Sequence, residues 1–123
     1  MSYIKGLAHI GVIVNDMNKS IDFYKKLGFV LDKEENPGVK LAFISAGTCL
    51  IELIEKPHER TAGIVDHIAI EVSDIEAAVK AANEKGITID LAAIRGVNIM
   101  GSIKNVFFQG LDGERLEFFE YVK

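Results

Sequence analysis

The chain has 123 residues, of which 49% are hydrophobic, and its 18 acidic and 14 basic residues give a net charge of −4. This length provides one domain with a core of its own and no room for a second globular unit of ordinary size. The acidic balance argues against a nucleic-acid partner, because phosphate backbones attract basic surfaces. A single cysteine, Cys49, excludes an intrachain disulfide and a cysteine-rich zinc site, and we expect it to be a small core residue.

The first apolar stretch, "MSYIKGLAHIGVIV" at 1–14, is too short to cross a bilayer and is followed by no small-residue cleavage pattern. We therefore expect neither a signal peptide nor a transmembrane span, no membrane partner, and a cytoplasmic protein. Its second part, "LAHIGVIV" at 7–14, predicts a strand that contains His9.

A helix is predicted directly after this strand. Apolar side chains follow helical spacing behind Asp16, namely Met17, Ile21, Tyr24 and Leu27. Asp16 can cap the first turn with its carboxylate, and Gly28 supplies the left-handed residue that ends many helices.

Three strand-like segments follow, "FVLDKEE" (29–35), "VKLAFISA" (39–46) and "CLIELIE" (49–55), separated by turns at 36–38 and 46–48. The first half of the chain therefore has the element order β-α-β-β-β. Glu52 lies at the centre of the third segment, where burial of an unpaired carboxylate would cost several kcal/mol, on the order of 3 to 5.

The second half repeats the first. Residues 65–87 align with residues 7–29 without a gap, and five residues recur 58 positions later: His9, Ile10, Val14, Asp16 and Gly28 as His67, Ile68, Val72, Asp74 and Gly86. Asp74 and the stripe Ile75, Ala78, Val79 and Ala82 predict a second helix. Strands are predicted at 87–92, 104–110 and 114–121, with a turn at 111–113.

These elements predict an α+β fold of two tandem βαβββ modules, at 1–56 and 65–123. The link at 57–64 is short and polar, so we expect the modules to pack as a single domain.

The repeat places ligand-forming side chains at matching positions. His9 and His67 lie in the first strand of each module, and Glu52 and Glu117 in the last. If these strands are neighbours, one His and one Glu meet across them at roughly 4.5 to 5.5 Å between Cβ atoms. Two nitrogens and two oxygens suit one divalent metal, such as Zn, Ni, Co, Mn or Fe, with positions left for water or substrate.

The other carboxylates of the last strands, Glu55 and Glu120, are not expected to bind a metal. A single strand Glu or His is usually a surface or hydrogen-bonded residue, and only joint recurrence favours the metal interpretation. Glu55 and Glu120 have the opposite strand parity to Glu52 and Glu117, so we expect them on a solvated face.

The sequence resembles the vicinal oxygen chelate superfamily, which includes glyoxalase I, methylmalonyl-CoA epimerase, bleomycin resistance proteins, fosfomycin thiol transferases and extradiol dioxygenases. The resemblance covers essentially the whole chain. Its carriers are "HIGVIVNDMNKSIDFYKKLGF" (9–29), "GTCLIELIE" (47–55), "VDHIAIEVSDIEAAV" (65–79) and "DGERLEFFE" (112–120).

The resemblance implies a cup-shaped mixed sheet around one metal held by His9, Glu52, His67 and Glu117, usually in a homodimer. The site is formed within one chain or shared between two. The implied chemistry is chelation of adjacent substrate oxygens, which stabilises an enediolate. By analogy, Glu117 is the preferred proton-transfer base and Glu52 the more static ligand.

Four ligands favour the isomerase branches over the thiol transferases and dioxygenases, which use two His and one Glu. The resemblance favours a glyoxalase I-like lyase or isomerase acting on a small oxygenated substrate, such as the thiol adduct of a 2-oxoaldehyde. A methylmalonyl-CoA epimerase is the alternative, weakened because Asn36 replaces an acidic residue of those enzymes. A non-catalytic protein that binds an antibiotic is a third alternative. The segment 94–102 is either a lid or a surface loop.

Overall fold

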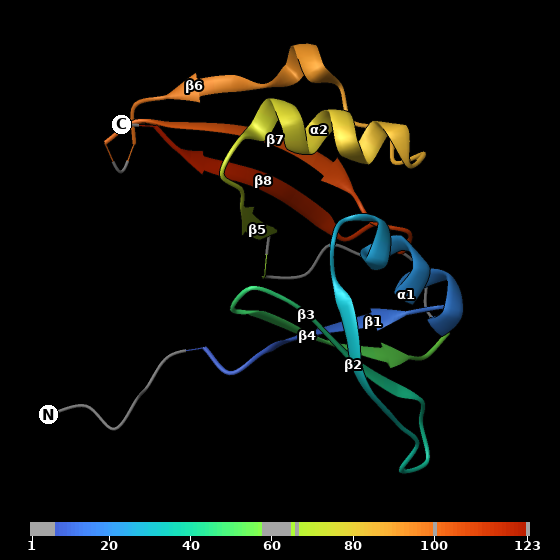
Figure 1. Cartoon of the computed structure of the whole chain (residues 1–123). Helices are drawn as coiled ribbons and strands as arrows, with labels where there is room; N and C mark the ends of the chain where they lie inside the picture. The colour runs from blue at the N-terminus through green and yellow to red at the C-terminus, as the bar shows by residue number, and fades with distance from the viewer. Residues whose placement is uncertain (1–6, 58–64, 66, 100, 123) are drawn as a thin grey trace, which may run out of the picture. The chain divides into compact units, whose positions relative to one another are not determined.

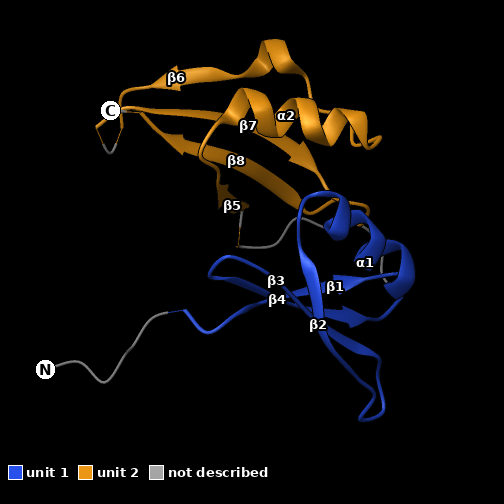
Figure 2. Ribbon diagram, viewed as in Figure 1, with its two compact units in different colours: residues 1–59 blue, residues 60–123 orange. Residues whose placement is uncertain are grey.

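The computed structural model describes residues 7–57, 65, 67–99 and 101–122. The chain divides into two compact units, residues 1–59 and residues 60–123 (Figure 2). Apart from Pro57, the predicted link at 57–64 lies outside the described residues. Each unit is described by itself.

The first unit is a four-stranded mixed sheet with one helix (Figure 1). Its elements in chain order are β1 (Ile10–Val14), α1 (Met17–Lys26), β2 (Val30–Glu35), β3 (Leu41–Ala46) and β4 (Cys49–Glu55). The strand order is β1-β4-β3-β2. The first strand runs parallel to the last, and the other neighbours are antiparallel.

The second unit repeats this topology, with the strand order β5-β8-β7-β6 and β5 parallel to β8. Its elements are β5 (Ile68–Glu71), α2 (Ile75–Glu84), the short 3-10 helix η1 (Leu91–Ala93), β6 (Arg95–Val97), β7 (Ile103–Gln109) and β8 (Arg115–Tyr121). The predicted α+β class and the two βαβββ modules are confirmed.

In each unit the helix covers one face of the sheet. Helix α1 packs against β2, β3 and β4, and α2 packs against β8 and η1. The buried side chains of β3 and β4 on the α1 side are Ala42, Ile44, Ile51 and Leu53, each 0% exposed. Because strand side chains alternate, Glu52 points to the other face, which carries no helix from the described residues 7–57.

The predicted helix ends are confirmed. Asp16 accepts a hydrogen bond from the amide of Lys19 at 3.1 Å, and Asp74 accepts one from Ala77 at 3.1 Å. Gly28 and Gly86 follow the two helices with φ of 106° and 87°, a conformation that favours glycine. No helix in the described ranges is long and apolar enough to cross a membrane.

The strand predicted at 87–92 is wrong. Ile87 and Ile89 are buried, as the alternation indicated, but the segment has no strand partner. The side chain of Asn83 instead donates to the carbonyl of Ile89 at 3.0 Å and accepts from its amide at 2.8 Å. Asp90 then caps the 3-10 turn by accepting from Ala92. The Asn83 amide and the Asp90 carboxylate thus take over hydrogen bonds that a neighbouring strand would make.

The surface-loop alternative for 94–102 is wrong for Arg95–Val97, and the lid stays a prediction. These three residues form β6, an edge strand paired with β7. In the topology of its unit, β6 takes the place that β2 has in the first unit. Met100, in the second half of the segment, lies outside the described residues.

Candidate metal centre

The first unit brings His9 and Glu52 together on the helix-free face of its sheet. The Nε2 atom of His9 lies 3.6 Å from Oε1 of Glu52. The parallel register pairs Gly11 with Glu52, so His9 lies diagonally, two residues before the opposing position. His9 directly precedes β1, whereas the sequence placed it inside the strand.

The second unit repeats this geometry with His67 and Glu117. Nε2 of His67 lies 3.2 Å from Oε1 of Glu117, and the register pairs Ala69 with Glu117. His67 directly precedes β5. Each predicted His therefore contacts the Glu of its own module, and both pairs occupy the same register position in their sheets.

The separation of the donor atoms in each pair can be compared with that of two ligands of one ion. Two atoms bound to one metal at about 2.0 to 2.1 Å, at angles from a right angle to the tetrahedral angle, lie about 2.9 to 3.4 Å apart. The His67–Glu117 separation of 3.2 Å falls inside this range, and the His9–Glu52 separation of 3.6 Å lies just outside it. Imidazole nitrogen and carboxylate oxygen are both donors that divalent transition metals accept.

An aromatic ring accompanies each pair, a feature that our sequence analysis missed. Phe43 pairs with Glu52 across β3 and β4, and its ring meets His9 edge to face with centroids 6.1 Å apart. Phe107 pairs with Glu117 across β7 and β8 and meets His67 in the same way at 5.4 Å. The rings restrict the two imidazoles.

A comparison of the two strands before Glu52 and Glu117 could have found these rings. Phe43 precedes Glu52 by nine residues and Phe107 precedes Glu117 by ten. In the second unit the guanidinium of Arg115 also lies over the Phe107 ring, 3.9 Å from its centroid.

The two carboxylates differ in their surroundings. The side chain of Glu52 is 20% exposed and that of Glu117 is 5% exposed. Glu117 also accepts a hydrogen bond from Asn105 at 2.8 Å, through the oxygen that does not face His67. Sequence patterns gave no signal for Asn105, because its counterpart in the first module is Leu41.

The prediction of a solvated face for Glu55 and Glu120 is wrong. Both are half-buried on the helix side of their sheets. Glu55 accepts a hydrogen bond from the amide of Met17 at 2.8 Å, and Glu120 accepts one from Ile75 at 2.7 Å. These amides begin the two helices and have no partner within them, so a strand carboxylate satisfies each.

A second group of carboxylates, Asp74, Glu76 and Glu120, has oxygens within 4.8 Å of one another. Asp74 and Glu120 accept hydrogen bonds from the first turn of α2. Glu76 forms an ion pair with Lys104 at 2.9 Å, and the ammonium lowers the pKa of Glu76. Helix capping and this ion pair account for the cluster.

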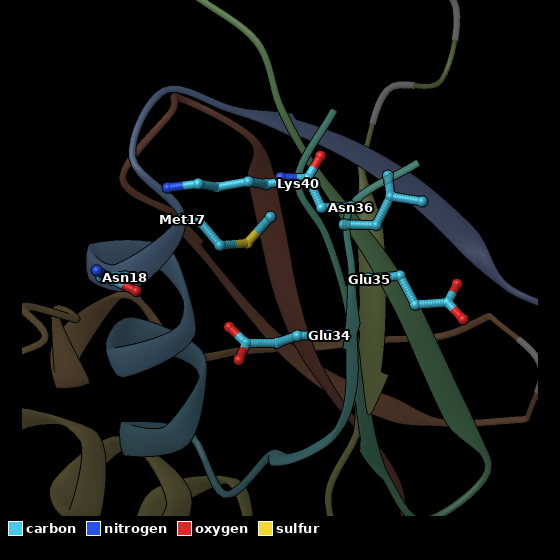
Figure 3. A pocket seen from close by; sticks show the side chains of 7 residues that line it. Met17, Asn18, Glu34, Glu35, Asn36 and Lys40 are labelled. Carbon is cyan, nitrogen blue, oxygen red and sulfur yellow. The ribbon is translucent and has the colours of Figure 1, made fainter. Parts of the chain in front are cut away.

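A hollow of about 330 Å³ lies elsewhere on the first unit (Figure 3). Its lining residues come from the start of α1 and from the β2–β3 hairpin: Met17, Asn18, Glu34, Glu35, Asn36, Lys40 and Leu41. Glu34 points toward α1 and Glu35 points away from it (Figure 3). Asn36 accepts from the amide of Gly38 within the hairpin turn. The hollow includes neither His9 nor Glu52.

Cys49 starts β4 and is half-buried. Burial raises the pKa of its thiol, which lowers the fraction of reactive thiolate at neutral pH.

Solved structures resemble this chain over nearly its whole length. The structure of SMU.1112c is 27% identical, with a TM-score of 0.81, and the match covers 95% of this chain and 99% of that one. A glyoxalase family protein from Enterococcus faecalis is 24% identical, with a TM-score of 0.79 and coverage of 97% and 100%.

A variant of the fosfomycin resistance protein FosX from Listeria monocytogenes is 19% identical, with a TM-score of 0.80 and coverage of 97% and 94%. It was crystallised with Mn(II) and 1S,2S-dihydroxypropylphosphonic acid. No curated protein matches the chain. A sequence model of one family matches residues 6–118, nearly the full length. The chain therefore belongs to the Glyoxalase/Bleomycin resistance protein/Dioxygenase superfamily, the group that its sequence resembles.

Proposed function

We propose that the protein is a metal-dependent lyase or isomerase of the glyoxalase I type, which abstracts a proton next to a carbonyl of a small oxygenated substrate. The observation that carries the proposal is the repeated pairing of His9 with Glu52 and of His67 with Glu117, at the same register in both units. Each pair brings an imidazole nitrogen and a carboxylate oxygen together, and divalent transition metals accept both donors.

The four side chains are the proposed ligands of one divalent ion, of the group Zn, Ni, Co, Mn and Fe. The ion would supply positive charge to adjacent substrate oxygens, which favours the enediolate over the ground state. Glu52 and Glu117 are the proposed catalytic carboxylates, with Glu117, by family resemblance, as the proton-transfer base. Phe43 and Phe107 restrict the imidazoles and leave their Nε2 atoms directed at the carboxylates.

Metal analysis tests the ligand set. The purified protein, stripped of metal and titrated with Mn²⁺, Co²⁺, Ni²⁺ and Zn²⁺, is expected to bind one ion per site. Glu52→Gln and Glu117→Gln are each expected to weaken binding by at least about tenfold, since a charged ligand is lost. Glu84→Gln, an exposed residue at the end of α2, is the matched control with unchanged binding. Absence of stoichiometric metal in the wild-type protein would refute the proposal.

Proton exchange then tests the reaction. Methylglyoxal with several thiols and methylmalonyl-CoA are incubated in D₂O with the metal-loaded protein, and deuterium at the carbon next to the carbonyl is followed by NMR. Exchange with a thiol adduct supports the lyase, and exchange with methylmalonyl-CoA supports the epimerase. Fosfomycin, which has no carbonyl, is tested separately by following the opening of its epoxide by NMR, because FosX shares the fold.

A non-catalytic binding protein is the candidate of a different class. It requires neither metal nor proton transfer, so tight binding of bleomycin by the metal-free protein, with no exchange on any substrate, would favour it. The proposal also includes a homodimer and a cytoplasmic location. The dimer is measured by sedimentation equilibrium at several protein concentrations.

A further inference from the structure

The two oxygens of Glu117 have different partners. Oε1 faces Nε2 of His67 at 3.2 Å, and Oε2 accepts a hydrogen bond from Nδ2 of Asn105 at 2.8 Å. Both Asn105 and Glu117 are buried, at 6% and 4% exposure. A buried hydrogen bond to a carboxylate is short and strong, so Oε2 is held in place.

The amide of Asn105 is itself oriented. Nε of Arg95 donates to Oδ1 of Asn105 at 3.3 Å, and the register of β6 and β7 places these two residues opposite each other. Because the guanidinium has only donors, it selects the amide oxygen and turns the amide nitrogen toward Glu117. A chain of contacts therefore runs from Arg95 through Asn105 and Glu117 to His67.

The first unit has no such amide at the matching position. Phe43 and Phe107 oppose Glu52 and Glu117, and the residues two before them on β3 and β7 are Leu41 and Asn105. A leucine side chain donates no hydrogen bond. The two halves of the repeat are thus alike in His, Glu and Phe but differ at this neighbouring position, where only the second unit has an amide.

We propose that Asn105 is a positioning residue, which ties Oε2 of Glu117 and presents Oε1 as the single atom that binds the metal. The inference rests on the proposed metal function. With Oε2 held, Glu117 would bind the metal through Oε1 alone. Glu52 has no amide at the matching position, so no hydrogen bond of this kind selects which of its oxygens binds the metal.

Metal affinity and the spectrum of bound Co²⁺ test this role. Asn105→Leu introduces into the second unit the residue that the first unit has at the matching position, Leu41. Loss of a residue that hydrogen-bonds to a metal ligand lowers metal affinity about 10- to 100-fold, and we expect a loss in this range. We also expect a changed visible absorption of Co²⁺, because the released carboxylate can bind through both oxygens. Asn105→Asp, which keeps the shape and removes the donor, is expected to weaken binding as well.

The matched control is Asn36→Leu, the same substitution in the β2–β3 turn, where the side chain accepts from Gly38. It is expected to bind metal with wild-type affinity. Wild-type affinity and an unchanged Co²⁺ spectrum in folded Asn105→Leu would overturn the inference while the proposed function stands.

If Asn105→Leu does not fold, Arg95→Met tests the inference instead. Arg95 is exposed at the sheet edge, and the substitution removes its hydrogen bond to Asn105. A several-fold loss of affinity supports the inference, and an affinity within twofold of wild type overturns it. If the wild-type protein binds no metal, both the proposed function and this inference are refuted.

Discussion

Oε2 of Glu55 lies 2.8 Å from the amide nitrogen of Met17, so the last strand of the first unit caps the start of its helix. Glu120 and Ile75 repeat the contact at 2.7 Å. Glu52 and Glu55 lie three residues apart on β4 and therefore point to opposite faces of the sheet. One strand thus supplies a candidate ligand on one face and a helix cap on the other.

Loss of the cap is expected to lower stability without affecting the metal site. Glu55→Ala removes the partner of the Met17 amide and a negative charge at the positive end of α1, and about 1 kcal/mol of the free energy of unfolding should be lost. Glu120→Ala should have a similar effect through α2. Urea denaturation followed by circular dichroism measures both.

Glu35→Ala serves as the control for the cap, because Glu35 lies on β2 and its ion pair with Lys33 is exposed. Its free energy of unfolding should stay within about 0.5 kcal/mol of wild type. Equal stability of Glu55→Ala and wild type would show that the contact with Met17 contributes nothing.

Gly11 opposes Glu52 across β1 and β4, where the second unit has Ala69. A Cβ atom added to Gly11 would lie 3.7 Å from Cδ1 of Ile54 and 3.9 Å from Oε1 of Glu52, which is ordinary contact. Gly11→Ala should therefore raise stability by about 0.4 to 1 kcal/mol and leave metal affinity unchanged.

Gly11→Leu should instead displace the carboxylate. Its side chain extends into the volume of Glu52, so metal affinity should fall at least about tenfold while the fold is kept. Calorimetric titration of both variants measures the difference. Equal affinity in the two would mean that the space beside Glu52 has no part in binding.

The repeat explains why much of the fold was predictable from the sequence. Asp16 and Asp74, with the apolar stripes behind them, define both helices, and helix caps depend on residues close in sequence. The pairing of His with Glu was predictable for a similar reason, because the strand parities of Glu52 and Glu117 depend only on local alternation.

Contacts between distant residues were less predictable. The role of Glu55 depends on Met17, 38 residues away, and parity alone identified its face but not its partner. Asn105 contacts Glu117 only because β7 and β8 pair in one register, which no local pattern specifies. The recurrence of Glu55 as Glu120, three residues after each candidate ligand, was a signal that could have been used.

Asn83 holds the segment that was wrongly predicted as a strand. Its side chain makes two hydrogen bonds to the backbone of Ile89, which is 4% exposed. Asn83→Ala should lower the free energy of unfolding by about 1 to 3 kcal/mol, because two bonds are lost and a buried amide is left without its partner. Hydrogen exchange of the Ile89 amide should accelerate.

The same change at Asn18, exposed on α1, is the control for Asn83. Alanine favours helix, so Asn18→Ala should keep or slightly raise stability. Unaltered exchange at Ile89 in Asn83→Ala would indicate that other contacts hold the segment.

The ion pair between Glu76 and Lys104 gives a pH dependence with a defined sign. The hydrogen bond from the Lys104 ammonium, 2.9 Å from Oε1, lowers the pKa of Glu76, and Glu76 in turn raises the pKa of Lys104. The Glu76 contribution to stability is present above its unfolded pKa and is lost as pH falls through the lower folded value. The Lys104 contribution is present below its unfolded pKa and is lost as pH rises through the higher folded value.

Lys104→Met should therefore raise the pKa of Glu76 toward its ordinary value, as measured by carboxyl ¹³C NMR titration. High salt should do the same in the wild-type protein, because both side chains are partly exposed and salt screens such pairs. Lys80→Met should raise the pKa less, since Lys80 acts on Glu76 only by its charge and as the weakest of the causes. A Glu76 pKa that is identical in Lys104→Met and wild type would contradict the ion pair in solution.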